Sequence, residues 1–249
     1  MRIGTQTILS FLALVLILNY STYAGTSKDK DKSDIILSHT DFPDLDNEQQ
    51  SLNHFIENLA QRKGKYKNEE SFIRYVFHKT HNKYLKHYVE QAPIDQLFTK
   101  GYYDCLTGTA LYLMIFEELG YRHEVTELDY HVYLTISSGQ KTYIIESTDP
   151  LNGIIESGDR LHEKITPVEL EKYNSFYEYK SSICNTISVE QLIGLLNFNQ
   201  AVKSYNDFNF AQAWNILQTA KEHYPSERME EFELLILKEL NRSQTASIE

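Results

Sequence analysis

The stretch YDCLTGTALYLMIFEELG, residues 103–120, decides the fold class of this chain. Residues 106–119 are apolar on nearly every side, which predicts a helix that is buried over most of its surface. Asp104 is placed to cap the start of this helix, and Gly120 supplies the residue that ends it. Cys105 should therefore lie in the first turn of a buried helix.

Three β-strands are expected after this helix, because the apolar pattern changes to a period of two. They cover residues 125–128, 131–136 and 142–145, and residues 137–140 join the last two. If 138–139 is a two-residue turn, His131 lies opposite Glu146, with Cβ atoms about 4.5–5.5 Å apart. The same register pairs Tyr133 with Ile144 and Thr135 with Thr142.

Cys105, His131 and Glu146 together have the residue types of a thiol nucleophile site. A helix N-terminus favours negative charge and so should lower the pKa of the Cys105 thiol. An imidazole within hydrogen-bond reach can hold the thiol proton, and a carboxylate can fix the tautomer of the ring. Asp149, three residues beyond Glu146, is the alternative third member. A register slip of one residue would turn Glu146 to the other face.

These motifs give the chain a resemblance to the transglutaminase-like superfamily of papain-like cysteine enzymes. The matching stretch runs from about Phe72 to Asn152, and its main motifs are residues 103–112, 119–121, 130–133 and 143–148. The resemblance implies a Cys-His-acid triad with Cys105 and His131 as its first two members. Family members more often carry Asp followed by Pro-Thr at the third position, whereas Glu146 is followed by Ser-Thr here.

The fold expected from this resemblance is α+β, with the Cys105 helix packed on an antiparallel sheet. The corresponding domain covers residues 51–187. Apolar residues at helical spacing predict two helices between Ser51 and about Glu90, separated at Lys63-Gly64-Lys65.

Residues 188–241 are expected to be helical again and to form a C-terminal α-helical hairpin. Phe210, Ala213, Ala220 and Pro225 fall at the positions that a tetratricopeptide repeat gives to its aromatic, small and closing residues. The region also fits an ordinary helical hairpin. One such unit cannot bury its own faces, so it should pack on the preceding domain or on a further helix expected over residues 228–240. Its surface is also a candidate site for a protein partner. Residues 242–249 are expected to be a tail.

The N-terminal residues are expected to be an export signal. Arg2, a short apolar run over residues 8–18, and small residues up to Ala24 are typical of a signal peptide covering residues 1–24. The run is too short to span a bilayer, so no membrane span is expected in the mature chain, which would be periplasmic or extracellular. Residues 25–50 are polar and charge-rich, and are expected to be a flexible leader.

Two cysteines, Cys105 and Cys184, remain in this exported chain, and their simplest interpretation is a disulfide, which would mask the nucleophile. His78, His81 and His87 complete no recognisable metal-ligand pattern, so they are expected to be solvated or packed rather than ligands. No motif indicates a cofactor.

The composition excludes several classes of protein. The chain has 249 residues, 41% of them hydrophobic and 24% charged, with only 10 glycines and 5 prolines. These values indicate a globular protein rather than a collagen-like or low-complexity one. The formal net charge of −11 would repel a phosphate backbone, so nucleic acid is not an expected partner.

Two functions follow as hypotheses. The first is an exported cysteine-dependent peptidase, amidase or transglutaminase-type enzyme that acts on amide bonds of a peptide or protein. The second is a non-catalytic module of the same fold that binds peptide or protein partners. A low pKa of Cys105 would favour the enzyme, and an ordinary thiol pKa would favour the module.

Overall fold

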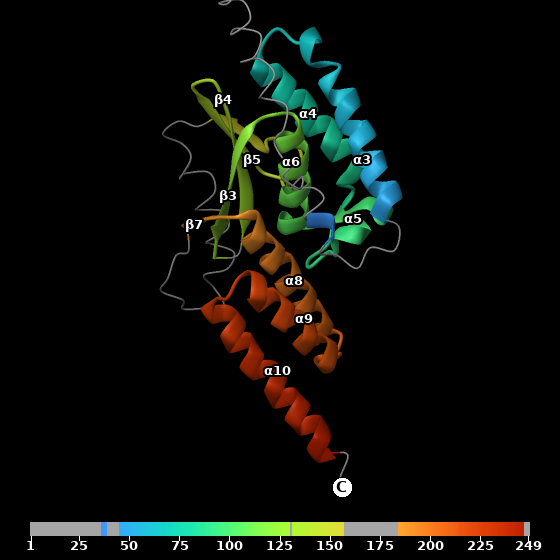
Figure 1. The fold of residues 1–249 in the computed structure, drawn as a ribbon, viewed down its shortest axis with the longest axis vertical. Helices are drawn as coiled ribbons and strands as arrows, with labels where there is room; N and C mark the ends of the chain where they lie inside the picture. Colours follow the sequence, from blue (N-terminus) through green and yellow to red (C-terminus); the bar gives the residue numbers. More distant parts are fainter. Residues whose placement is uncertain (1–35, 39–44, 130, 157–183, 247–249) are drawn as a thin grey trace, which may run out of the picture.

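The computed structural model describes residues 36–38, 45–129, 131–156 and 184–246 (Figure 1). These residues combine α-helices with an antiparallel five-stranded sheet, so the expected mixture of helix and antiparallel sheet is confirmed. The predicted signal peptide and the stretch between residues 157 and 183 lie outside the described residues. None of the described helices has both the length and the apolarity needed to cross a bilayer.

Helices α3 (Leu45–Ala60) and α4 (Glu69–Tyr84) form the N-terminal part of the structure. The predicted break between them is confirmed, since Lys63–Lys65 form only a short 3-10 turn, η1. Helix α4 ends earlier than expected. A short helix, α5 (Ile94–Lys100), and a parallel pair of two-residue strands, β1 (His87–Tyr88) and β2 (Tyr102–Tyr103), follow it and were not predicted.

Helix α6 (Cys105–Glu118) is the central element, and its predicted limits are confirmed closely. The Asp104 side chain caps its start, and Thr107 completes a capping box by accepting a hydrogen bond from the Asp104 backbone N–H. Gly120 follows the helix with φ of +80°, the left-handed conformation that favours glycine. Helix α6 packs between α4 and the sheet (Figure 1).

The sheet has the strand order β6-β5-β4-β3-β7, and every neighbouring pair is antiparallel. Three of its strands correspond to predicted ones: β3 (Arg122–Leu128), β4 (Val132–Ser138) and β5 (Lys141–Ile145). Strands β6 (Ile154–Glu156) and β7 (Cys184–Ile187) add its two edges and were not predicted. Because β7 pairs with β3, the C-terminal helices begin directly beside the strand that leads to His131.

The predicted register of the β4–β5 hairpin is wrong by two residues. Ser138 pairs with Lys141, so Gly139 and Gln140 form the turn. The φ of +63° at Gly139 explains this choice, because a primed hairpin turn needs a positive φ at its first position. Thr135 therefore lies opposite Ile144, and Ser137 opposite Thr142. A shift of two residues keeps every side chain on its predicted face.

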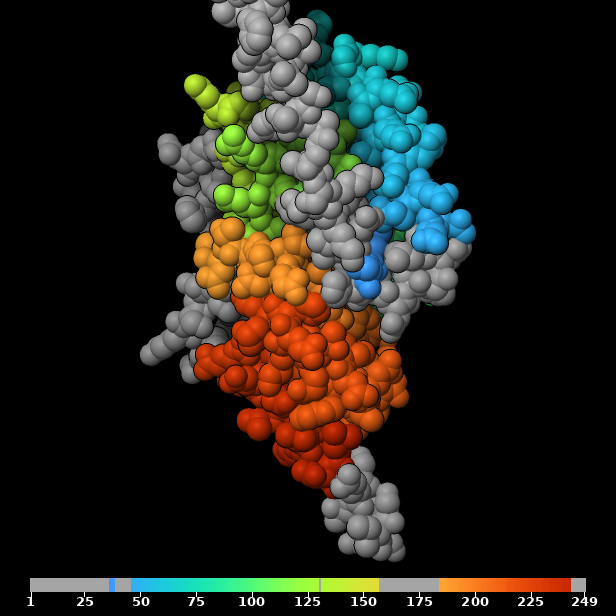
Figure 2. Space-filling view, in the orientation of Figure 1, coloured from blue at the N-terminus to red at the C-terminus, as the bar shows by residue number. Residues whose placement is uncertain are grey.

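Helices α8 (Val189–Asn206), α9 (Phe210–His223) and α10 (Glu227–Ala246) form the C-terminal part of the structure. The predicted hairpin corresponds to α8 and α9, which approach closely: a Cβ on Gly194 would lie 2.5 Å from the Tyr224 Cβ. Helix α10 packs on α9 as a third helix and reaches Ala246, so the predicted start of a tail at 242 is wrong. In Figure 2 these helices lie directly against the preceding part of the chain.

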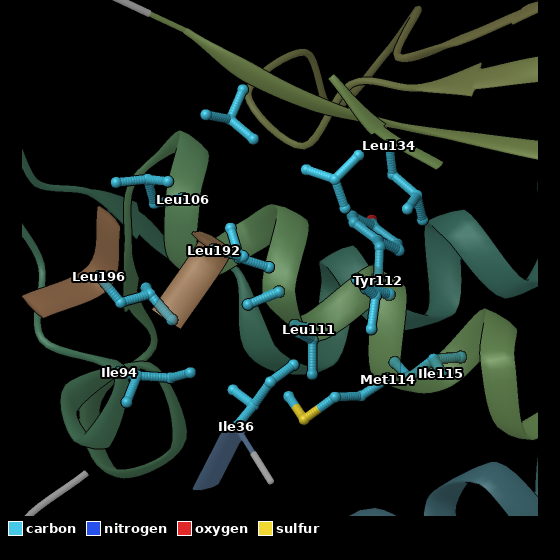
Figure 3. Close-up of a cluster of buried hydrophobic side chains, with 14 of the residues drawn as sticks. Ile36, Ile94, Leu106, Leu111, Tyr112, Met114, Ile115, Leu134, Leu192 and Leu196 are labelled. Atoms are coloured by element: carbon cyan, nitrogen blue, oxygen red, sulfur yellow. The ribbon is translucent and has the colours of Figure 1, made fainter. Parts of the chain in front are cut away.

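The core joins all of these elements around α6. Figure 3 shows α6 side chains such as Leu111 and Met114 beside Ile36, with Leu192 and Leu196 of α8 nearby. Ile36 is 0% exposed and Leu37 is 1% exposed, and α3 already begins at Leu45. The expectation of a flexible leader over residues 25–50 is therefore wrong for these residues, because the two apolar side chains fill a place in the core.

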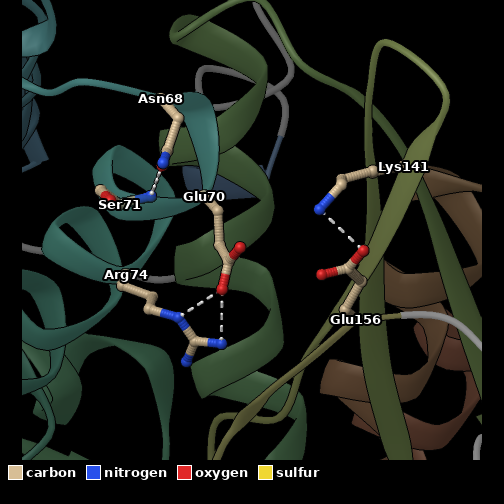
Figure 4. A network of polar contacts seen from close by, with 6 residues as sticks. All are labelled: Asn68, Glu70, Ser71, Arg74, Lys141 and Glu156. Atoms are coloured by element: carbon tan, nitrogen blue, oxygen red, sulfur yellow. Dashed lines mark hydrogen bonds and ion pairs between the residues drawn. The ribbon is translucent and has the colours of Figure 1, made fainter.

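Exposed polar pairs lie along the outer helices and the sheet edge (Figure 4). Asn68 caps α4 by accepting a hydrogen bond from the Ser71 N–H, and Arg74 donates to Glu70 one turn away. The Nζ atom of Lys141 lies 2.9 Å from Oε1 of Glu156, and this ion pair joins β5 to β6. Solvent screens such pairs, so each contributes little to stability, typically about 0–1 kcal/mol.

Candidate active site

Cys105 occupies the first helical position of α6 and is partly exposed. Asp104, the residue before it, is 2% exposed and uses one carboxylate oxygen to accept hydrogen bonds from the Thr107 backbone N–H and hydroxyl, at 2.8 and 2.9 Å. The Leu106 N–H also donates to this carboxylate. Asp104 does not accept a hydrogen bond from the backbone N–H of Cys105 itself. This N–H is therefore the remaining first-turn donor nearest to the sulfur.

His131 lies directly before β4 and is 7% exposed. Its Nε2 atom is 2.5 Å from Oε2 of Glu146, which directly follows β5. The contact between the ring and Glu146 is therefore confirmed, although the two residues lie beyond the last paired residues of the hairpin rather than directly opposite each other. A diagonal contact on one face replaces the predicted direct pair.

The ring of His131 lies close enough to the thiol of Cys105 to lower the pKa of the thiol through hydrogen bonding and charge, and the thiol raises the pKa of the ring. Since Nε2 faces Glu146, the Nδ1 atom is the ring nitrogen available to the sulfur. The structure thus brings together all three residues selected from the sequence, in the order thiol, imidazole, carboxylate. The two cysteines do not form a disulfide: both are free, and Cys184 is exposed at the start of β7.

Glu146 is fixed by the loop that follows it. Its second oxygen, Oε1, accepts hydrogen bonds from the Thr148 backbone N–H at 2.9 Å and from the Thr148 hydroxyl at 2.6 Å. Asp149, the alternative third member, instead closes the turn by accepting from the N–H groups of Leu151 and Asn152, at 3.1 and 2.8 Å. Glu146 is therefore the carboxylate that orients the ring.

Two close approaches hold this loop against α6 and against itself. A Cβ on Gly108 would lie 2.6 Å from the side chain of Ser147, so the absence of a side chain lets the helix touch the loop. A Cβ on Gly153 would lie 2.3 Å from the Glu146 carbonyl oxygen and 2.5 Å from that of Asp149. The Glu146 N–H donates to the Gly153 carbonyl at 2.7 Å. These contacts fix the distance between the cysteine helix and the carboxylate.

The pKa values of His131 and Glu146 move in opposite directions. Burial lowers the pKa of His131, but the hydrogen bonds and charges of Cys105 and Glu146 outweigh it and raise this pKa to about 11. Burial raises the pKa of Glu146, yet its hydrogen bond to His131 and the charge of the ring bring it below the ordinary value. The two residues therefore form a buried ion pair near neutral pH.

The expected lowering of the Cys105 pKa is wrong. Burial raises the pKa of the thiol, and the charges of Asp104 and Glu146 raise it further, while the hydrogen bond and charge of His131 lower it without reversing the shift. The main physical reason is burial of the thiol, and the cap residue adds to it. Asp104 is itself a carboxylate, so it binds the first-turn N–H groups that would otherwise favour the thiolate and adds a negative charge beside it.

A pocket of about 370 Å³ opens at Cys105 and His131. Its walls come from the segment after α4, from the start of α6, from the β3–β4 connection and from helices α8 and α10. Much of its lining is apolar or aromatic: Tyr88, Leu106, Leu128, Val132, Leu195 and Phe198. A peptide segment or a side chain could enter this pocket and bring an amide group to the sulfur.

The C-terminal helices contribute to this pocket, which was not predicted from the sequence. Asn199 of α8 donates to the free oxygen of Asp104, and Arg228 of α10 pairs with Glu127, a β3 carboxylate that is 1% exposed. In each of these two pairs, the partners lie about a hundred positions apart in the sequence. A buried carboxylate in a strand pattern, as at Glu127, is a signal that a distant donor is needed, but it does not identify the donor.

No group of three or more His, Cys, Asp or Glu side chains among the described residues could hold a metal ion. Burial lowers the pKa of His81, whose ring packs against Phe77 and Tyr103.

In comparisons with known proteins, no family model matches the chain, and no match was found among the curated proteins or the solved structures. What the site can do therefore follows from its own geometry.

Proposed function

We propose that this protein is a cysteine-dependent acyl-transfer enzyme of the peptidase, amidase or transglutaminase type, with a papain-like arrangement of helix and sheet. The observation that carries the proposal is the connected series from the Cys105 thiol to the His131 ring and from the ring to Glu146 at 2.5 Å, at one end of an open pocket. Thiol nucleophiles need this combination of a proton-holding ring and an orienting acceptor.

The proposed reaction uses each group in turn. The Cys105 thiol first loses its proton to solvent, because the His131 ring already holds one. The thiolate then attacks the carbonyl carbon of an amide, and the carbonyl electron pair moves onto oxygen, where the Cys105 N–H can donate to it. The carbon–nitrogen bond then breaks, and the departing amine takes a proton from the His131 ring. Water or a second amine attacks the resulting thioester and gives a proton back to the ring, and the sulfur leaves.

An ester that acylates any competent thiol tests this proposal without knowledge of the natural substrate. Wild-type protein mixed with p-nitrophenyl acetate should release nitrophenol in a burst and should carry an acetyl group on Cys105, seen by peptide mass spectrometry. Because Cys184 is a second free and exposed thiol, the test is made in a Cys184→Ala background, which should retain the burst. Adding Cys105→Ala to this background should abolish it, and a burst that survives in the double variant would rule out Cys105 as the nucleophile.

The raised pKa of the thiol favours a second function, a non-catalytic module that binds a peptide in the same pocket. Because little thiolate would exist near neutral pH, the pocket could serve for recognition alone. The module predicts that Cys105 in a Cys184→Ala background is acylated no faster than a small free thiol at the same pH, and that Cys105→Ala binds a peptide library as well as wild-type protein. The enzyme predicts the burst described above.

Export belongs to the same proposal, with cleavage after Ala24 and a peptide or protein as the substrate or partner. N-terminal sequencing of the protein recovered outside the cytoplasm tests the cleavage position. A mature chain that still begins at Met1 would contradict it.

A further inference from the structure

Asp104 receives hydrogen bonds from two parts of the molecule. One oxygen, Oδ1, accepts from Thr107 within α6 itself. The other, Oδ2, accepts from the Asn199 side-chain amide at 2.9 Å, and Asn199 belongs to α8. The residue that begins the cysteine helix is therefore held from outside by the C-terminal helices.

This contact lies beside the proposed nucleophile. Asp104 directly precedes Cys105, and both residues line the pocket together with Asn199. Because Asp104 is 2% exposed, water can replace a lost hydrogen bond only poorly, so the carboxylate depends on its protein donors. Any movement of Asp104 moves the first turn of α6 and the thiol with it.

Other charged groups face the same space and are part of the thiol's environment. His131 and Glu146 face the thiol from the sheet, and Glu90, Glu127, Asp129 and Arg228 line the pocket around it. Arg228 is paired with Glu127, and His131 with Glu146. Asp104 is the carboxylate adjacent to Cys105 in the chain, and its side-chain donor from outside α6 is Asn199.

We propose that Asn199 is a positioning residue for Cys105: from α8 it holds the N-cap carboxylate of α6 in place, and with it the thiol and the negative charge next to the thiol. The inference rests on the proposed function in taking Cys105 as the nucleophile. It makes the C-terminal helices a working part of the site rather than an attached partner surface.

The first experiment removes the donor. In a Cys184→Ala background, so that only Cys105 reacts, the rate of alkylation by iodoacetamide is measured against pH for the variant Asn199→Leu. Loss of the donor should loosen the first turn of α6 and weaken the thiol–ring hydrogen bond, which lowers the thiol pKa in the wild-type protein. The midpoint of the profile should therefore rise, with about a fivefold slower reaction at pH 9, equivalent to about 0.7 pKa unit.

The matched control is Asn197→Leu on the same helix. Asn197 bonds only to the Ile193 carbonyl of its own helix in the described structure, so this variant should keep the wild-type midpoint. If Asn199→Leu also keeps the wild-type midpoint, whatever its melting temperature, Asn199 is a packing residue and the inference is overturned.

A second experiment exchanges the two partners. Asn199→Asp places two carboxylates in contact, so it should lower the melting temperature at pH 9 and shift the alkylation midpoint upward. The double variant Asp104→Asn with Asn199→Asp restores one amide and one carboxylate. It should regain most of the lost melting temperature and lower the midpoint below that of Asn199→Asp. A double variant no more stable than Asn199→Asp would contradict the pairing.

These measurements separate the inference from the proposed function. Alkylation needs no catalysis, so a shifted midpoint in Asn199→Leu without any ester burst in wild-type protein would support the positioning role and reject the enzyme. A burst in wild-type protein with an unshifted midpoint in Asn199→Leu would support the enzyme and reject the positioning role.

Discussion

Cys105 ionises under opposing influences, of which burial is the largest. His131 donates a hydrogen bond and carries a positive charge, which favour the thiolate, whereas burial and the Asp104 carboxylate favour the neutral thiol. The balance keeps the proton on sulfur near neutral pH. The same structure keeps a proton on His131 up to a pKa of about 11. The reactive pair of thiolate and imidazolium therefore requires a pH at which the thiol has lost its proton and the ring still holds its own.

The raised pKa of the Cys105 thiol predicts an alkaline pH profile for the acylation of this residue. The rate of the ester burst should rise only above about pH 8.5, the ordinary thiol pKa, because the Cys105 pKa is raised. It should fall again near pH 11, where His131 loses the proton that the leaving group needs. Stopped-flow measurements from pH 6 to 11.5 test both limbs. A plateau already reached at pH 7 would contradict the raised thiol pKa.

Glu146→Gln should weaken the fold in a pH-dependent manner. The lowered pKa of Glu146 contributes stability above its unfolded value of about 4.3, and this contribution is lost as the pH falls. The raised pKa of His131 contributes stability below about 6.5, and this contribution is lost as the pH rises toward 11. Urea unfolding should therefore show the largest loss, about 2 kcal/mol, between these pH values.

The control for this loss is Asp149→Asn. Asn can still accept the two turn hydrogen bonds made by Asp149, so its free energy of unfolding should stay within about 0.5 kcal/mol of the wild-type value. A loss in Asp149→Asn as large as in Glu146→Gln, with the same pH dependence, would make Asp149 the partner of the ring instead.

Among the helices and strands, local sequence signals were sufficient to predict helix α6. The hairpin register and the contacts between distant parts of the chain were not predicted. Asp104 and Gly120 define the ends of this helix, so the local sequence alone was sufficient to predict it. The hairpin register depended on whether Gly139 takes the first or the second turn position, and its positive φ decides this only in the folded chain. The predicted contact between His131 and Glu146 is still formed, because a register shift of two residues keeps both side chains on one face.

The missed elements share a different cause. Ile36 and Leu37 belong to a run of three apolar residues, 35–37, in a polar segment, so only the presence of a matching gap in the core shows that they are buried. Asn199 contacts Asp104 across 95 positions of sequence, and no periodicity relates the two. Partners brought together by tertiary packing leave no local pattern.

The loop after β5 gives a prediction at the same scale. Gly153→Ala should displace the loop that carries Glu146, because the new Cβ would meet two backbone carbonyl oxygens within 2.5 Å. We expect a loss of about 2–3 kcal/mol in the free energy of unfolding and a slower ester burst. The control is Gly64→Ala, where a Cβ meets no atom within 4 Å. Equal behaviour of the two variants would show that the loop is not held by this contact.

At the scale of the whole molecule, the C-terminal helices neutralise a charge that the sheet buries. Glu127 of β3 is 1% exposed, and both of its oxygens are bound from the C-terminal part of the chain: one by Arg228 and the other by the Tyr224 hydroxyl at 2.8 Å. A buried carboxylate without its cation is strongly destabilising. The sheet and helices α8–α10 should therefore unfold as one cooperative unit.

Arg228→Met tests this coupling. The variant keeps much of the side-chain volume but removes the guanidinium, so Glu127 keeps only its hydrogen bond to Tyr224. We expect a loss of about 3 kcal/mol, somewhat reduced because the Arg228 side chain is 29% exposed. The matched control, Arg242→Met, removes an exposed arginine of the same helix that pairs with Glu239, and should change stability by less than about 0.5 kcal/mol.

The double variant Glu127→Gln with Arg228→Met separates the cost of an unpaired charge from the loss of packing. Because the amide carries no charge, the double variant should be more stable than Arg228→Met alone, and differential scanning calorimetry should show a single transition for each protein. Two separate transitions in the wild-type protein would mean that the helices fold independently of the sheet. In that case the wall they contribute to the Cys105 pocket would be lost before the site itself unfolds.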